Sequence, residues 1–387
     1  IALYDLSPAS FNNCIITGNK AYIASNILSH WGGGVYIHYT NPTFSNCTIA
    51  GNYHVSGNTG DGIFTYGVPV IKNSIIERLY SVPVNSSDVS YSYVSGGHPG
   101  LGNISLDPLF VSPFAPTLGN TPNTLGDYHL QACSPAINMG DNSTVISLTD
   151  FDKNTRIRYS TVDMGAYEKQ DIDLSTSTWK GVNTNWNDKI NWCGGFIPYD
   201  TTNVVIPSSL SNYPVINTGY NNGVKNILLS SGTSVSLQYN GSLSIYGTYT
   251  NNGSTILNKG KWLMAGSSAG QTFPGTLATV SAMNQLEINN PSGMTFNKSF
   301  DITGSLIPIS GNINVNNVEV TLKSSDTATA NVDVIQPASS ISYTGTGAFI
   351  VERFINTGLM AGQHQKTWQF LATPTTGQTI YQSWQES

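Results

Sequence analysis

The sequence predicts an all-β protein whose N-terminal part is a right-handed parallel β-helix, followed by a second β-solenoid or β-sandwich-like region. Two features of composition support this class. Of the 387 residues, 38 are Gly and 40 are Asn, and both types favour turns and are poor in helix interiors. Short runs of Val, Ile, Leu and Tyr separate these turns, as expected for short strands. The third and strongest observation is an internal repeat, which indicates stacked coils.

The repeat begins close to the N-terminus. Segment 10–19 (SFNNCIITGN) recurs as segment 43–52 (TFSNCTIAGN), and the two are identical at six of ten positions. Degenerate copies follow at 71–76, after a shorter interval, and at 91–94. A change in period needs only a longer or shorter loop, so all four segments fit successive coils of one solenoid.

Stacking of these coils makes specific contacts predictable. Neighbouring strands lie about 4.8 Å apart, so Phe11 should lie over Phe44 and Cys14 over Cys47. The four cysteines follow neither a disulfide framework nor a metal-site spacing, and we expect all of them to be free thiols. One Asn recurs at the same point of each coil and should form a ladder at a turn: Asn13, Asn46 and Asn73.

Charge excludes some partners. Only 10% of residues are charged, the net charge is −6 and no Lys/Arg cluster exists, which argues against nucleic acid and anionic membranes. No apolar run approaches the ~20 residues of a membrane span. Because the chain starts in what reads as mid-repeat, without a signal peptide, we expect it to be a piece of a longer protein.

Four motifs then carry a family resemblance: NISLDPLF at 103–110, DYHL at 127–130, SPAINMGD at 134–141 and VDMGAYE at 162–168. In this order they resemble the closing region of the choice-of-anchor β-helix proteins, which are secreted or surface-anchored in Bacteroidota. The resemblance implies a first domain over 1–172 and an extracellular or cell-surface location.

A second resemblance covers about 178–387. The Trp-containing motifs around Trp179, Trp186 and Trp192, with NVVIP at 203–207, are similar to a module of surface proteins exported by the type IX secretion system. We expect these Trp residues to form the core of a second module. The predicted domains are 173–345 for this module and 346–387 for the start of a further, truncated β domain.

Catalysis has one candidate group in the β-helix. The separation of Asp61 and Asp88 equals the shorter repeat interval, so they could stack one coil apart with Arg78 nearby, as in a polysaccharide lyase or glycoside hydrolase. The sequence motifs of polygalacturonases are missing. We therefore favour the interpretation that these are solvated loop residues and that the protein is not an enzyme.

Two further polar groups fall in the closing region. Asp150, Asp152 and Asn154 space three oxygen ligands as Ca²⁺ loops do, but the Gly of such loops is missing, so we favour an Asx turn and expect no cofactor. Three charged residues match an R…D-x-G-A-Y-E pattern of the resembled family, and we interpret them as an ion-paired plug at the end of the β-helix: Arg156, Asp163 and Glu168.

Aromatic residues are the candidate binding surface. Trp31, Tyr36, His38 and Tyr66 cluster over two coils, and sugars stack on exposed aromatic faces. Strand alternation should place Tyr36 and His38 on one face and Tyr39 on the other, so at most half of these rings should be exposed. We predict a non-catalytic adhesion or display segment that binds extracellular glycans or other surface proteins. The alternatives are a carbohydrate-active enzyme and a spacer without a ligand.

Overall fold

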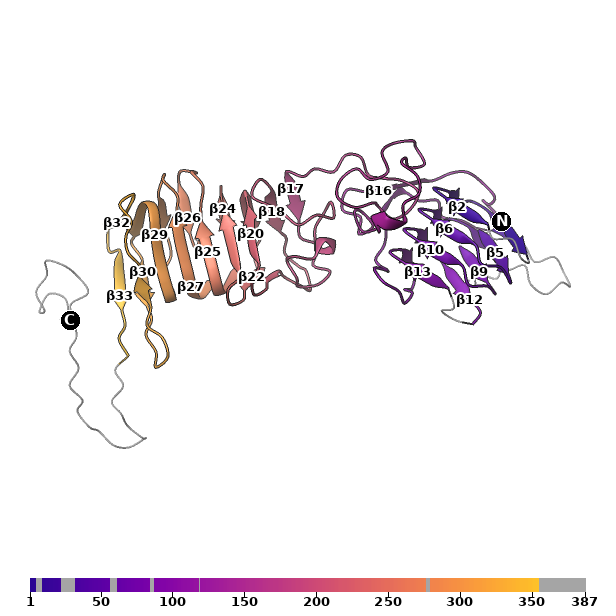
Figure 1. The fold of residues 1–387 in the computed structure, drawn as a ribbon. Coiled ribbons are helices and arrows are strands. Elements are labelled where there is room, and N and C mark those ends of the chain that lie inside the picture. Colours follow the sequence, from indigo (N-terminus) through magenta and orange to yellow (C-terminus); the bar gives the residue numbers. More distant parts are fainter. Residues whose placement is uncertain are drawn as a thin grey trace, which may run out of the picture.

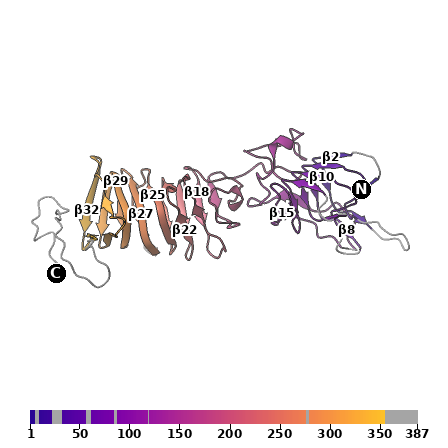
Figure 2. The same ribbon diagram turned by 60° about the horizontal axis from the view of Figure 1, so that its bottom comes forward.

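The protein is an elongated stack of parallel strands, described by a computed structural model at residues 1–4, 9–21, 32–55, 61–83, 87–117, 119–275 and 279–354. A β-helix forms one end and a second solenoid the other (Figure 1; Figure 2). Within the described residues the helical elements are two 3₁₀ turns, η1 (Asn142–Thr144) and η2 (Lys189–Asn191). The predicted all-β, parallel and stacked fold class is confirmed.

The β-helix has three four-stranded parallel sheets and a shorter fourth one. Sheet A contains β1 (Ala2–Tyr4), β5 (Val35–His38), β9 (Ile63–Thr65) and β12 (Leu79–Ser81). Sheet B contains β2 (Ser10–Asn12), β6 (Thr43–Ser45), β10 (Val70–Lys72) and β13 (Asp88–Ser90). Sheet C contains β3 (Ile15–Ile16), β7 (Thr48–Ile49), β11 (Ile75–Ile76) and β14 (Tyr93–Val94), and β4 (Lys20–Ala21) pairs with β8 (Tyr53–His54).

The predicted stacking between coils is confirmed. The rings of Phe11 and Phe44 are parallel, with centroids 4.8 Å apart, and Cys14 and Cys47 are free thiols that lie close enough to affect each other's pKa. The Asn ladder has a backbone cause, because each coil turns from sheet B to sheet C through one residue at positive φ. These residues are Asn13, Asn46, Asn73 and, in the fourth coil, Tyr91. Asn tolerates this left-handed conformation better than most residues.

A layer of irregular chain, residues 104–172, covers the outer face of sheet C; we call it the flank layer. It contains one antiparallel hairpin, β15 (Phe110–Ser112) with β16 (Asp127–Leu130). Thr48 of β7 bonds to the backbone N–H of Ala166, and Ile75 of β11 packs among the layer's buried apolar residues. Sheet C is therefore covered on both faces, which explains why three of its four strands carry apolar residues at consecutive positions.

The second solenoid winds from residue 173 onward in two large sheets. The first contains β17 (Thr176–Thr178), β18 (Asn203–Ile206), β21 (Asn226–Leu229) and β24 (Tyr249–Asn251). The thirteen-stranded second sheet curls around the core. It contains β19 (Val215–Ile216), β20 (Asn221–Val224), β22 (Ser234–Leu237), β23 (Ser242–Ile245), β25 (Thr255–Met264), β26 (Gln271–Phe273), β27 (Thr279–Asn289), β28 (Met294–Phe296), β29 (Phe300–Asn316), β30 (Glu319–Leu322), β31 (Asn331–Val332), β32 (Ser339–Thr344) and β33 (Ala348–Val351).

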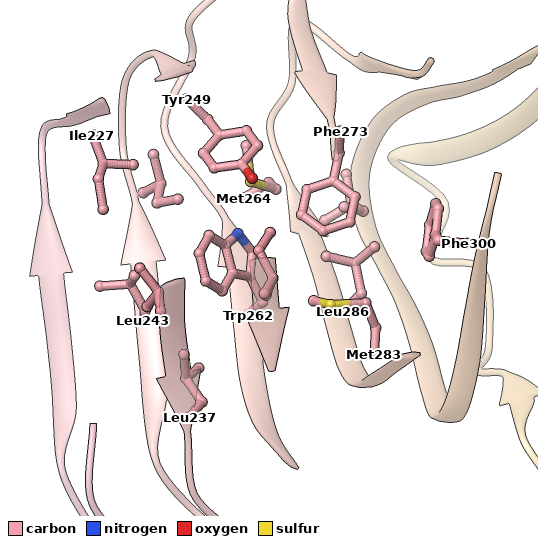
Figure 3. Packing of buried hydrophobic residues seen from close by; sticks show 14 of the residues in the cluster. Ile227, Leu237, Leu243, Tyr249, Trp262, Met264, Phe273, Met283, Leu286 and Phe300 are labelled. Carbon is pink, nitrogen blue, oxygen red and sulfur yellow. The ribbon is translucent and has the colours of Figure 1, made fainter. Parts of the chain in front are cut away.

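Side chains of successive coils fill the core of this solenoid in rows. Figure 3 shows Trp262 between Leu243 and Leu286, which are its strand-register partners on either side. As predicted, Trp179, Trp186 and Trp192 are buried in the same core. Of the predicted third domain, β33 pairs in parallel with β30 of this solenoid, and residues 355–387 lie outside the described part.

A disulfide joins the two halves of the molecule. Cys133 of the flank layer is bonded to Cys193, which follows η2 in the second solenoid. The expectation that all four cysteines are free thiols is therefore wrong for this pair. Sequence spacing could not reveal the bond, because the two residues are 60 apart and meet only when the solenoid begins against the flank layer.

Candidate functional site

The outer face of sheet A carries a row of aromatic side chains. Strand register places Tyr36 of β5, Phe64 of β9 and Tyr80 of β12 on adjacent strands. Their rings stack in sequence, with centroids 6.1 Å apart for Tyr36 and Phe64 and 5.1 Å for Phe64 and Tyr80. Stacking occupies ring faces within the row, so Tyr36 is only 7% exposed, whereas Tyr80 at the end of the row is 40% exposed.

Beside this row lies a tighter group of four rings, Tyr4, His38, Tyr39 and Tyr66, which we call the aromatic patch. His38 is central: its ring centroid lies 5.7 Å from that of Tyr4, 4.4 Å from that of Tyr39 and 6.1 Å from that of Tyr66. Tyr39 is 67% exposed and Tyr4 is 51% exposed. The patch thus offers aromatic surface to solvent, backed by partly buried rings.

The exposure of two aromatic residues differs from what strand alternation alone indicates. Tyr39 does not point inward, because β5 ends at His38 and Tyr39 adopts a φ of 51° that turns it out of the strand. Tyr36 does face outward, but its neighbours bury it. Trp31 lies outside the described residues. Sequence reasoning missed Tyr4 and Tyr80; Tyr80 pairs with Phe64 across a short coil and is therefore out of step with the repeat.

The candidate acidic residues divide between two sheets. Asp61 precedes β9 in sheet A, and its Oδ2 lies 3.8 Å from Nε of Arg78. Asp88 instead begins β13 in sheet B, where Val70 is its register partner. The expected stacking of Asp61 on Asp88 is wrong, because the coil that leads from β10 to β13 is shorter than the coils before it. The carboxylate near Asp61 is instead Glu77, whose pKa is raised by burial and which accepts a hydrogen bond from the backbone of Gly51.

The residues of the candidate calcium loop already have protein partners. The Asp150 carboxylate accepts the backbone N–H groups of Asn154 at 2.8 Å and Glu168 at 3.0 Å. Asp152 accepts from Nε2 of His129 at 2.7 Å. Burial acts to lower the pKa of His129, but hydrogen bonds to Asp152 and Asp127 outweigh it and raise that pKa. Among the described residues, no group of three His, Cys, Asp or Glu side chains is arranged to hold a metal.

Arg156, Asp163 and Glu168 form one buried cluster in the flank layer. The Arg156 guanidinium donates to the carbonyl oxygens of Ala166 at 2.9 Å and Gly165 at 2.6 Å, rather than directly to a carboxylate. Asp163 and Glu168 each accept two backbone N–H groups. Their attraction to Arg156 therefore acts over a longer distance.

The prediction that this cluster closes the end of the β-helix is wrong. It lies against the middle coils, where Gly165 donates its N–H to the carbonyl of Asn73 and Ala166 bonds to Thr48. The end of the stack is instead met by Asn103, whose amide group bonds to the backbone of Ser92 and Val89 in the last coil. The family motif does not give a position along the stack, because chain that covers an end and chain that covers a flank both bury apolar strand surface.

Comparison of the chain with protein-family models, with curated proteins and with solved structures gives no match. The fold and the geometry of its side chains therefore carry the functional argument. No helix among the described residues is long and apolar enough to cross a bilayer.

Proposed function

We propose that this chain is a non-catalytic adhesion or display segment of a secreted cell-surface protein, and that it binds glycans weakly through the aromatic patch. The observation that carries the proposal is the exposure of Tyr39 and Tyr4 beside the ring of His38. Large exposed aromatic surface is uncommon without a binding role, and a tyrosine combines an apolar face with a polar tip.

The architecture is consistent with display. Parallel stacking produces a long body with the aromatic patch in the end that contains the N-terminus (Figure 1). The Cys133–Cys193 disulfide holds the two halves together, and such bonds persist in oxidising, extracellular compartments. The motif resemblances to choice-of-anchor β-helix proteins and to type IX-secreted surface proteins of Bacteroidota support the same location.

Glycan binding can be tested on an array of neutral and acidic oligosaccharides with the wild-type chain and Tyr39→Ala. Loss of one stacking face should weaken binding by about two- to ten-fold. Tyr343→Ala is a matched control, because Tyr343 is an exposed tyrosine of the second solenoid. Binding at this patch should change little with salt, since ring stacking is not screened as charge pairs are. If the array shows no ligand, or if Tyr39→Ala binds as the wild type does, glycan recognition by the patch is refuted.

The enzyme alternative requires a separate assay. We expect no unsaturated or reducing-end products from pectin, with or without Ca²⁺, because Asp88 lies in a different sheet from Asp61 and Arg78. Product formation that disappears in Asp61→Ala would overturn this assignment and favour a lyase or hydrolase.

A further inference from the structure

The second solenoid contains a polar recess at one corner of its stack. Segment 238–241 separates β22 from β23. The end of β22 pairs with Asn258 of β25 and the start of β23 pairs with Lys261, and only two residues lie between these two positions. In β27 the corresponding gap is a single residue, Asn284. The corner therefore shortens from coil to coil, and residues of all three turns line one recess. The result is a cavity of about 210 Å³ between them.

The lining of this recess has a defined chemistry. Its side chains include amides, a serine, two lysines and one tyrosine, and no carboxylate. Tyr239 is 64% exposed, and the ammonium group of Lys259 lies 5.9 Å from its ring centroid. The recess is therefore locally positive on a chain whose net charge is −6.

The two lysines of the recess differ in whether a carboxylate neutralises the positive charge of the ammonium group. Lys261 is held by the carboxylate of Glu287 at 2.8 Å. Among the described residues, no carboxylate forms an ion pair with Lys259, and its side chain is exposed. Lys259 is thus the cation available to a ligand, while Tyr239 beside it provides an apolar ring face.

Hydrogen-bonding groups complete the recess. Ser242 donates to Asn221 Oδ1 at 2.7 Å, and Asn284 Nδ2 donates to the carbonyl of Lys259 at 2.9 Å. These bonds fix both amides and leave the NH₂ group of Asn221 and the Oδ1 of Asn284 to face other partners. Fixed donors and acceptors around an aromatic face suit a ligand with several hydroxyl groups rather than an apolar one.

We propose that this recess binds an acidic sugar unit of the uronic acid class. The sugar ring packs on Tyr239, its carboxylate pairs with Lys259, and its hydroxyls bond to the amides of the lining. A charge-assisted bond between an ammonium and a carboxylate is stronger than a neutral one, so the acidic group determines selectivity. The site is separate from the aromatic patch and does not depend on glycan binding there.

The test uses two disaccharides that differ only in one carboxylate: cellobiouronic acid and cellobiose. Isothermal titration of the whole chain should give tighter binding of the acidic sugar, and the affinity should fall as ionic strength rises. Lys259→Gln should weaken binding of cellobiouronic acid by about ten-fold and remove the preference over cellobiose. Tyr239→Ala should weaken binding of both sugars.

Two control variants make the result specific. Lys225→Gln removes another exposed lysine of the same solenoid and should bind as the wild type does. Tyr39→Ala should also leave this binding unchanged, which separates failure of this proposal from failure of the aromatic patch. The proposal is overturned by absence of cellobiouronic acid binding at millimolar concentration, by equal affinity for the two sugars, or by wild-type binding in Lys259→Gln.

Discussion

The disulfide between Cys133 and Cys193 should make a large contribution to stability, which the double variant Cys133→Ser, Cys193→Ser removes. The bond closes a loop of 60 residues that spans most of the flank layer and the first coil of the second solenoid. In the chain-entropy treatment, such a loop constrains the unfolded chain by about 4 kcal/mol. For a unit of about 150–250 residues, this corresponds to a melting temperature lower by roughly 8–16 °C.

Thermal unfolding followed by circular dichroism measures this effect. Lys180 and Asn138 also bond across the junction, so the double variant should still fold. Adding dithiothreitol to the wild-type chain should reproduce the loss, and it should not affect the double variant further. Cys14→Ser serves as a control, because Cys14 is a free thiol. A melting temperature that stays within about 2 °C of the wild type would show that the two segments are held together without the bond, and the loop argument would fail.

Three further outcomes follow from the flank layer. Arg156→Ala should cost about 3–5 kcal/mol of unfolding free energy in chemical denaturation, because it leaves buried carbonyls and carboxylates without their cation; an unchanged denaturation midpoint would contradict this. Burial raises the pKa of Asp163 to about 6 and that of Glu168 to about 8. The folded state therefore binds more protons than the unfolded state, and the free energy of unfolding should fall as the pH rises from about 5 to 8. Glu168→Gln should make this dependence on pH weaker. A free energy of unfolding that rises over the same range would reject the prediction. Asn73→Ala should lose about 2–4 kcal/mol, because the Asn73 side chain makes three bonds to the flank layer at a positive φ; Asn13→Ala, with one such bond, should lose less, and equal losses would show that the turn conformation alone matters.

Much of the coil stack was predictable because a solenoid relates sequence position to spatial position through a repeat. Equivalent residues lie one strand spacing apart, so Phe11 over Phe44 and Cys14 beside Cys47 followed from the offset between the first two copies. The burial of Trp179 in the second module followed from the three closely spaced Trp-containing motifs. These inferences succeeded where a residue's neighbours come from the next coil.

The same reasoning failed where coil length changed. The separation of Asp61 and Asp88 equals the offset between the second and third copies of the repeat. The last coil is shorter than that offset, so Asp88 pairs with Val70 instead. The exposed ring of Tyr80 escaped notice for the same reason. Register is set by where each strand pairs, and loop length between strands does not reveal that pairing.

The sequence alone determined the all-β class, the parallel β-helix at the N-terminal end and the contacts between its adjacent coils, because all of these depend on local strand pattern and short repeat distance. It left the second region open between a solenoid and a sandwich. Only the tertiary structure decided which face of the β-helix the flank layer covers, that Cys133 meets Cys193, and that the Lys259 ammonium group lies over the Tyr239 ring. These are contacts between segments that no repeat relates. They arise because irregular chain must bury the apolar outer face of sheet C, and because coils of unequal length must stack at one fixed strand spacing.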